Sequence, residues 1–103
     1  MRFIEIKFLF EGVIFSSQVF IEGISDSLNR YEFIISFSTK YLICKYRDAY
    51  FFVLENDRFK HTYGRDEKED ELIKTLQEAI MNVYHNIRKD FHMQKEYCYD
   101  EVL

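Results

Sequence analysis

Residues 66–91 read DEKEDELIKTLQEAIMNVYHNIRKDF, and this stretch decides the fold because its apolar residues change period. They recur every three or four positions, which is the spacing of one face of an α-helix. The members of this stripe are Leu72, Ile73, Leu76, Ile80, Val83, Tyr84, Ile87 and Phe91. Acidic residues crowd the start of the segment and basic residues lie near its end, as the helix dipole favours. The spacing predicts one long C-terminal helix over residues 66–95, followed by a tail at 96–103.

Residues 1–64 alternate between apolar and polar side chains instead, which is the period of a half-buried β-strand. Turn-forming residues divide this segment into expected strands at 2–10, 13–22, 30–38, 41–47 and 49–56, with a short sixth strand at 58–63 left open. The residues expected to face the core are Ile4, Ile6, Phe8, Phe10, Val13, Phe15, Val19, Ile21, Tyr31, Phe33, Ile35 and Phe37. The predicted fold class is therefore α+β: an antiparallel meander of five or six strands with the long helix packed on one face.

This order of elements is broadly similar to that of a pleckstrin-homology-like barrel. The helix tryptophan of many such domains is absent here, because the chain contains no Trp, and six strands is one short of that barrel. The similarity is one of topology, so it implies no ligand.

The composition is that of one globular domain. The chain has 103 residues, of which 48% are apolar and 18% aromatic, with three glycines and no proline. No linker or repeat divides it, so residues 1–103 are expected to form a single domain. No apolar run is long enough to span a membrane. Cys44 and Cys98 are too few for a disulfide framework, so we expect a cytoplasmic protein, with Cys44 a buried free thiol in its strand.

No motif for catalysis is recognisable in the sequence. It contains no glycine-rich phosphate loop and no serine in a nucleophile elbow. His85 and His92 are seven residues apart, about 10 Å along a helix, which is too far to share one metal ion. The five carboxylates between residues 66 and 71 are explained by the start of the helix. We therefore expect no enzymatic activity, no cofactor and no metal site.

The sheet face away from the helix is expected to be half apolar, whereas an exposed antiparallel face is normally polar. The residues expected to bind a partner there are Phe3, Leu9, Ile34, Tyr41, Ile43, Phe51 and Val53. An exposed patch of this kind usually marks an interface. The alternative is that the sheet curls into a partial barrel and buries these side chains within the chain.

The favoured hypothesis for function is a non-enzymatic protein-interaction module. In this hypothesis the chain is a small intracellular inhibitor or adaptor that docks sterically on a partner protein. Its size, its net charge of −4 and its aromatic content resemble those of phage or mobile-element products that block a host nucleic-acid-handling enzyme. Self-association through the second sheet face is the nearest competing hypothesis. No membrane partner is expected.

A further alternative is binding of a nucleotide or single-stranded nucleic acid on the basic, tyrosine-rich strands of residues 40–65. This segment has a net charge of +3, against −7 for the remainder of the chain. On a sheet, cations hold phosphates while aromatic rings stack on bases. The candidate residues are Tyr41, Lys45, Arg47 and Phe51, and the first three are expected to share one sheet face.

Overall fold

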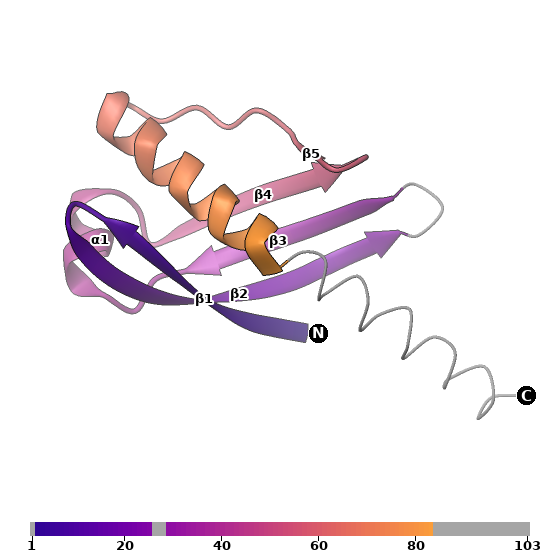
Figure 1. Ribbon diagram of the computed structural model, residues 1–103, viewed down its shortest axis with the longest axis horizontal. Coiled ribbons are helices and arrows are strands. Elements are labelled where there is room, and N and C mark those ends of the chain that lie inside the picture. The colour runs from indigo at the N-terminus through magenta and orange to yellow at the C-terminus, as the bar shows by residue number, and fades with distance from the viewer. Residues whose placement is uncertain (1, 26–28, 84–103) are drawn as a thin grey trace, which may run out of the picture.

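The computed structural model describes residues 2–25 and 29–83 of the chain (Figure 1). The elements are β1 (Arg2–Phe10), β2 (Val13–Ser25), β3 (Arg30–Ser36), α1 (Lys40–Lys45), β4 (Ala49–Glu55) and β5 (Arg58–Phe59). The C-terminal helix begins at residue 67 and is described as far as residue 83. The strands form one antiparallel sheet in the order β1-β2-β3-β4-β5, which confirms the predicted α+β meander with a C-terminal helix. The predicted helical residues 84–95 and the tail at 96–103 lie outside the described residues.

A tight turn sets the register of the first two strands. Glu11 and Gly12 both adopt positive φ angles, 52° and 76°, which is the pattern of a two-residue type I′ turn. The turn pairs Phe10 with Val13, and the pairing continues without a shift along the whole of β1. Even-numbered residues of β1 therefore lie on one face of the sheet and odd-numbered residues on the other.

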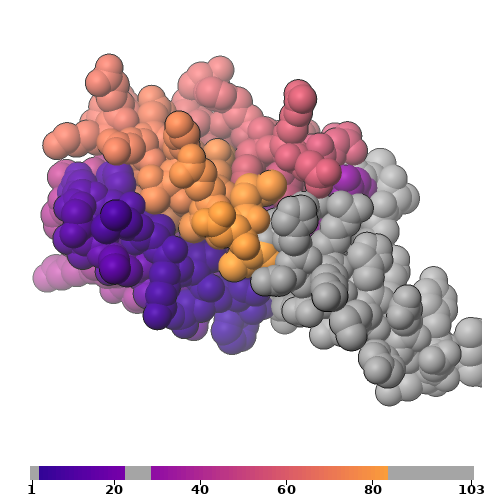
Figure 2. All heavy atoms as spheres, viewed as in Figure 1, coloured from indigo at the N-terminus to yellow at the C-terminus, as the bar shows by residue number. Residues whose placement is uncertain are grey.

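The sheet curves into a half-barrel, and the C-terminal helix packs against its inner face (Figure 1). The atoms of the helix adjoin those of β1 (Figure 2). The helix contributes Leu72, Leu76 and Ile80, each with 0% exposure. The buried apolar residues of the strands and of the segment after β3 are Ile6, Phe8, Phe10, Phe15, Val19, Ile21, Tyr31, Phe33, Ile35, Phe37, Tyr50, Phe52 and Leu54. Two predicted core residues differ: Val13 is 51% exposed beside the turn, and Ile4 is only partly buried.

The strand predicted at 41–47 is wrong, because most of this segment forms helix α1 in the connection between β3 and β4. Only Leu42 and Tyr46 of the segment are buried, and they lie four residues apart, as on one face of a helix. β3 and β4 pair directly with each other, so no strand can lie between them. The described sheet therefore has five strands, and the sixth strand expected at 58–63 is limited to β5. Cys44 is exposed on α1 and not buried in a strand.

Reciprocal hydrogen bonds define where the C-terminal helix begins. The Asp66 carboxylate accepts the backbone N–H of Glu69 at 2.9 Å. The Glu69 carboxylate in turn accepts the backbone N–H of Arg65 at 2.7 Å, which completes an arrangement close to a capping box. Asp70 accepts the backbone N–H of Gly64 at 2.7 Å. Three of the clustered carboxylates thus anchor the helix start, as the acidic cluster predicts.

Candidate functional site

Four apolar residues form a continuous row across the outer face of the sheet, the face away from the C-terminal helix. The strand register pairs Phe3 with Phe20, Phe20 with Ile34, and Ile34 with Phe51. We call these four residues the outer row. Phe3 and Phe51, at its two ends, are 58% and 52% exposed. The ring centroids of Phe3 and Phe20 are 6.0 Å apart. The outer row is therefore an open apolar strip that crosses four strands.

Polar residues flank the outer row on both sides. The next row toward the β1–β2 turn contains Glu5, Gln18, Ser36 and Ala49, and the row on the opposite side contains Glu22, Glu32 and Val53. Val53 is half-buried and extends the apolar strip along β4. An apolar centre with a polar rim is the usual composition of a protein–protein interface.

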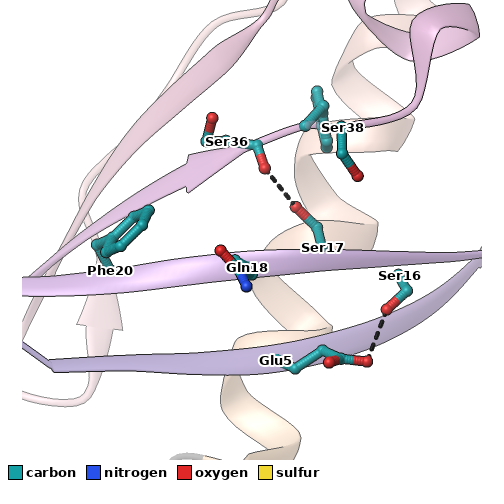
Figure 3. Close-up of a pocket in the computed structure, with 8 residues that line it drawn as sticks. Glu5, Ser16, Ser17, Gln18, Phe20, Ser36 and Ser38 are labelled. Atoms are coloured by element: carbon teal, nitrogen blue, oxygen red, sulfur yellow. Dashed lines mark hydrogen bonds between the residues drawn. The ribbon is translucent and has the colours of Figure 1, made fainter.

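A polar hollow of about 450 Å³ adjoins the outer row, and Phe20 lines both (Figure 3). It lies at a fork in the sheet, because β3 ends at Ser36 while β1 and β2 continue as a hairpin. The Ser17 hydroxyl donates a hydrogen bond across the fork to the backbone oxygen of Ser36 at 3.0 Å. The Ser16 hydroxyl donates to the Glu5 carboxylate at 2.8 Å. Carboxylate and hydroxyl oxygens here offer acceptors to the donor groups of a docked partner.

The structure brings together four of the residues predicted to bind a partner. Phe3, Ile34 and Phe51 belong to the outer row, and Val53 follows Phe51 on the same face of β4. The sheet also curls, as the alternative hypothesis expected. Curling does not bury the outer row, however, because the helix fills the inner side of the half-barrel and both ends of the row stay more than half exposed.

The other three predicted partner-binding residues lie elsewhere. Leu9 is on the outer face but near the turn, where it pairs with Ile14. Tyr41 and Ile43 are exposed on α1 and so do not belong to the sheet face.

Tyr41 and Lys45 contribute to a cluster around Glu11 that attaches α1 to the β1–β2 turn. The Tyr41 hydroxyl donates a hydrogen bond to the Glu11 carboxylate, and the Tyr46 hydroxyl donates a second one at 3.0 Å. Lys45 Nζ lies 3.2 Å from the same carboxylate. The hydrogen bond from Tyr41 is the main cause that lowers the pKa of Glu11 to about 2, with Lys45 and Tyr46 adding to it. The hydrogen bond with Tyr41 also raises the pKa of Lys45. The charges of this cluster therefore balance one another.

Arg47 belongs to a second network, around the buried carboxylate of Glu69. Glu69 is 1% exposed and accepts hydrogen bonds from the Tyr50 hydroxyl at 2.9 Å and from Arg47 at 3.4 Å. Burial raises the pKa of Glu69, but the backbone N–H of Arg65, the Tyr50 hydroxyl and the two guanidinium groups outweigh it, so the pKa is lowered. Burial, followed by the hydrogen bond with Glu69, raises the pKa of Tyr50. Sequence reasoning missed this buried carboxylate, although its capping-box spacing from Asp66 is a visible signal.

The sheet surface predicted for nucleic acid is not formed, because residues 40–45 are helical. Tyr41 and Lys45 lie on α1, Arg47 follows it, and Phe51 is on β4 in the outer row. Both cations are paired with carboxylates of the two networks described above. The four candidate residues therefore do not share one sheet face.

Comparison with known proteins gives no match: no family matches the sequence, no curated protein is significantly similar, and no solved structure matches the fold. Within residues 2–25 and 29–83, no group of three or more His, Cys, Asp or Glu residues is placed to hold a metal ion. No helix in the same two ranges is both long and apolar enough to cross a membrane.

Proposed function

We propose that this chain is a non-enzymatic protein-interaction module that docks on a partner protein through the outer row. It would act as an inhibitor or adaptor by covering part of that partner's surface. The observation that most directly supports the proposal is the register that aligns Phe3, Phe20, Ile34 and Phe51. Each of the three strand pairings along the outer row places two apolar residues side by side, and the rows on either side are mainly polar. Large aromatic side chains are typical anchors of protein interfaces.

Docking would remove from water the exposed parts of the outer row. Phe3 and Phe51 are 58% and 52% exposed. Full burial of a Phe side chain contributes about 1.5–3 kcal/mol, so the portion of each that is now exposed would contribute about 1 kcal/mol or more. Two such residues with their half-buried neighbours are enough for an anchor at the centre of an interface.

The rim indicates the chemistry of the partner. The rows that flank the outer row contain Glu5, Glu22 and Glu32 and no basic residue, and the nearest basic side chain, Arg30, lies 3.8 Å from Glu32 in an ion pair. An apolar surface with basic or hydrogen-bond-donating groups around it would be complementary to this face. Basic surfaces of that kind are typical of proteins that handle nucleic acid, the class of partner in the sequence-based hypothesis.

The test compares the proteins that wild-type chain and two matched double variants capture from the source cell. The first variant, Phe3→Ser with Phe51→Ser, removes both ends of the outer row. The second, Val13→Ser with Tyr63→Ser, removes two other exposed apolar side chains, which are 51% and 76% exposed. We expect the wild type and the second variant to capture the same protein and the first variant to lose it.

Circular dichroism should show all three proteins equally folded, because each substituted side chain is at least half exposed. Retention of the captured protein by the Phe3/Phe51 variant would contradict docking through the outer row. Equal loss in both double variants would contradict it as well, since the loss would then follow from removing any exposed apolar residue.

A further inference from the structure

β1 is the first strand of the sheet, and no strand within the described residues pairs with its outer edge. In a two-residue hairpin, the residues that flank the turn form a hydrogen-bonded pair, here Phe10 and Val13. Hydrogen-bonded pairs alternate with non-bonded pairs along an antiparallel ladder, so the even-numbered residues of β1 bond to β2. The odd-numbered residues direct their backbone N–H and C=O groups toward the open edge. A long exposed edge of this kind is a template for pairing with another chain.

The sequence of β1 is complementary to a second copy of itself. We propose that two copies of this chain form a symmetric dimer in which their β1 strands pair antiparallel, centred on Ile6. In this register, Glu5 of each copy lies opposite Lys7 of the other, and Phe3 lies opposite Leu9. On the inner face, Ile4 lies opposite Phe8 and Ile6 opposite Ile6, while Phe10 at the end of the strand lies opposite Arg2. The odd-numbered residues, whose backbone groups are directed to the edge, form the hydrogen-bonded pairs.

Charge distinguishes this register from its neighbours. Because odd-numbered residues must lie opposite odd-numbered residues, the adjacent antiparallel registers are centred on Glu5 or on Lys7. The first sets two Glu5 carboxylates against each other, and the second sets two Lys7 ammonium groups against each other. Like charges directly opposite are destabilising, whereas opposite charges stabilise a pair. Lysine on an edge strand ordinarily discourages pairing, but in the register centred on Ile6 it meets a carboxylate.

The dimer also accounts for two apolar residues that lie apart from the outer row. Leu9 and Ile14 pair with each other near the turn and are 64% and 73% exposed. In the dimer, Leu9 of one copy adjoins Phe3 of the other, so each outer row continues into the Leu9–Ile14 pair of the second copy. Separate apolar strips thereby become one face that spans both sheets. This inference goes beyond the proposed function, since it concerns a different surface, and its test does not require the docking partner.

Charge reversal on β1 tests this register. Glu5→Lys or Lys7→Glu alone creates two like-charge pairs in the dimer, whereas mixing the two variants restores two opposite-charge pairs in a heterodimer. We expect concentration-dependent dimerisation of the wild type in sedimentation velocity. Each variant alone should dimerise about tenfold or more weakly, and the mixture should recover the dimerisation of the wild type.

The matched control reverses two exposed charges of the C-terminal helix, with Lys74→Glu and Glu78→Lys made together. These residues lie beside Phe59 of β5, at the opposite edge of the sheet. The control should dimerise as the wild type does, because it changes no charge on β1.

Hydrogen exchange gives a second measurement that needs no variant. In the dimer, the backbone N–H groups of Glu5, Lys7 and Leu9 become hydrogen-bonded across the interface, so their exchange should slow as the protein concentration rises. A wild type that stays monomeric at the highest concentration reached would overturn the proposal. A dimer whose affinity neither reversal changes would also overturn it, as would a mixture that dimerises no better than either variant alone.

Discussion

Replacing Glu69 by Ala should be strongly destabilising. The side chain is 1% exposed and accepts hydrogen bonds from the Arg65 backbone N–H at 2.7 Å and the Tyr50 hydroxyl at 2.9 Å. Leaving the buried Tyr50 hydroxyl without an acceptor costs about 1–3 kcal/mol, and the N–H of the more exposed Arg65 costs about 1 kcal/mol. The expected decrease in unfolding free energy is about 2–4 kcal/mol, to which the solvent-exposed guanidinium groups add little.

Urea unfolding of the wild type, Glu69→Gln and Glu69→Ala measures this decrease. Glutamine keeps the volume and one acceptor oxygen, so it should lose only about 1–2 kcal/mol, because hydrogen bonds to a neutral acceptor are weaker. Glu67→Ala removes an exposed carboxylate from the same helical turn and is the control, with an expected change below about 0.5 kcal/mol. An alanine variant within about 1 kcal/mol of the wild type would refute this account of the network.

Glu69→Gln should also change how the unfolding free energy depends on pH. Burial raises the pKa of Glu69, but its hydrogen bonds and the nearby guanidinium groups outweigh burial and lower it. The folded-state pKa therefore lies below the unfolded value of about 4.3, so the folded chain binds fewer protons. The stability that Glu69 contributes is fully present above that value and is lost as the pH falls through the folded pKa. Glu69→Gln should consequently lose less stability than the wild type on acidification, and parallel losses would show that the Glu69 pKa is not lowered.

Three further predictions concern the core, the helix start and the basic segment. Leu76→Asp places an unpaired charge at a site with 0% exposure and should lower the unfolding free energy by more than about 4 kcal/mol. A variant with the melting temperature of the wild type would contradict the packing of the helix on the sheet. Gly64→Ala places a Cβ 2.7 Å from the backbone nitrogen of Asp70 and should cost about 1–3 kcal/mol in urea unfolding; no loss would show that the turn relaxes freely. Short oligonucleotides at low salt should not bind, because carboxylates already balance Lys45 and Arg47; binding that Lys45→Glu with Arg47→Glu abolishes would restore the nucleic-acid hypothesis.

Most of the sheet could be predicted because its pattern has one interpretation. In β1 and β3, every second residue on the inner face is apolar apart from Arg2 at the start of β1. The described structure buries Ile6, Phe8 and Phe10 of β1 and Tyr31, Phe33 and Ile35 of β3 on that face. The turn between β1 and β2 has the short, glycine-containing connection that a type I′ hairpin requires. Local sequence was therefore sufficient for these elements.

Helix α1 could not be predicted in the same way, because its residues fit both periods. Tyr41 and Ile43 alternate as in a strand, while Leu42 and Tyr46 are spaced as in a helix. Aromatic and β-branched residues favour the strand, but the direct pairing of β3 with β4 leaves no place for it in the sheet. The position of Glu69 beside Tyr50 likewise depends on how the helix crosses the sheet, which local spacing does not reveal. Because α1 is a helix, Tyr41 and Ile43 lie apart from the other residues that were predicted to bind a partner.

The outer row requires an explanation that the inner core does not provide. Packing of the core requires apolar residues only at the inward-facing positions of each strand. The outward-facing positions can therefore be polar. The neighbouring outer rows show that polar side chains are accepted there, since Glu5 pairs with Gln18 on one side and Glu22 with Glu32 on the other. An apolar residue at the same level of four successive strands therefore does not follow from folding alone. Because hydrophobic surface left in water is unfavourable, a surface that becomes buried on association is the physical reason we assign to this row.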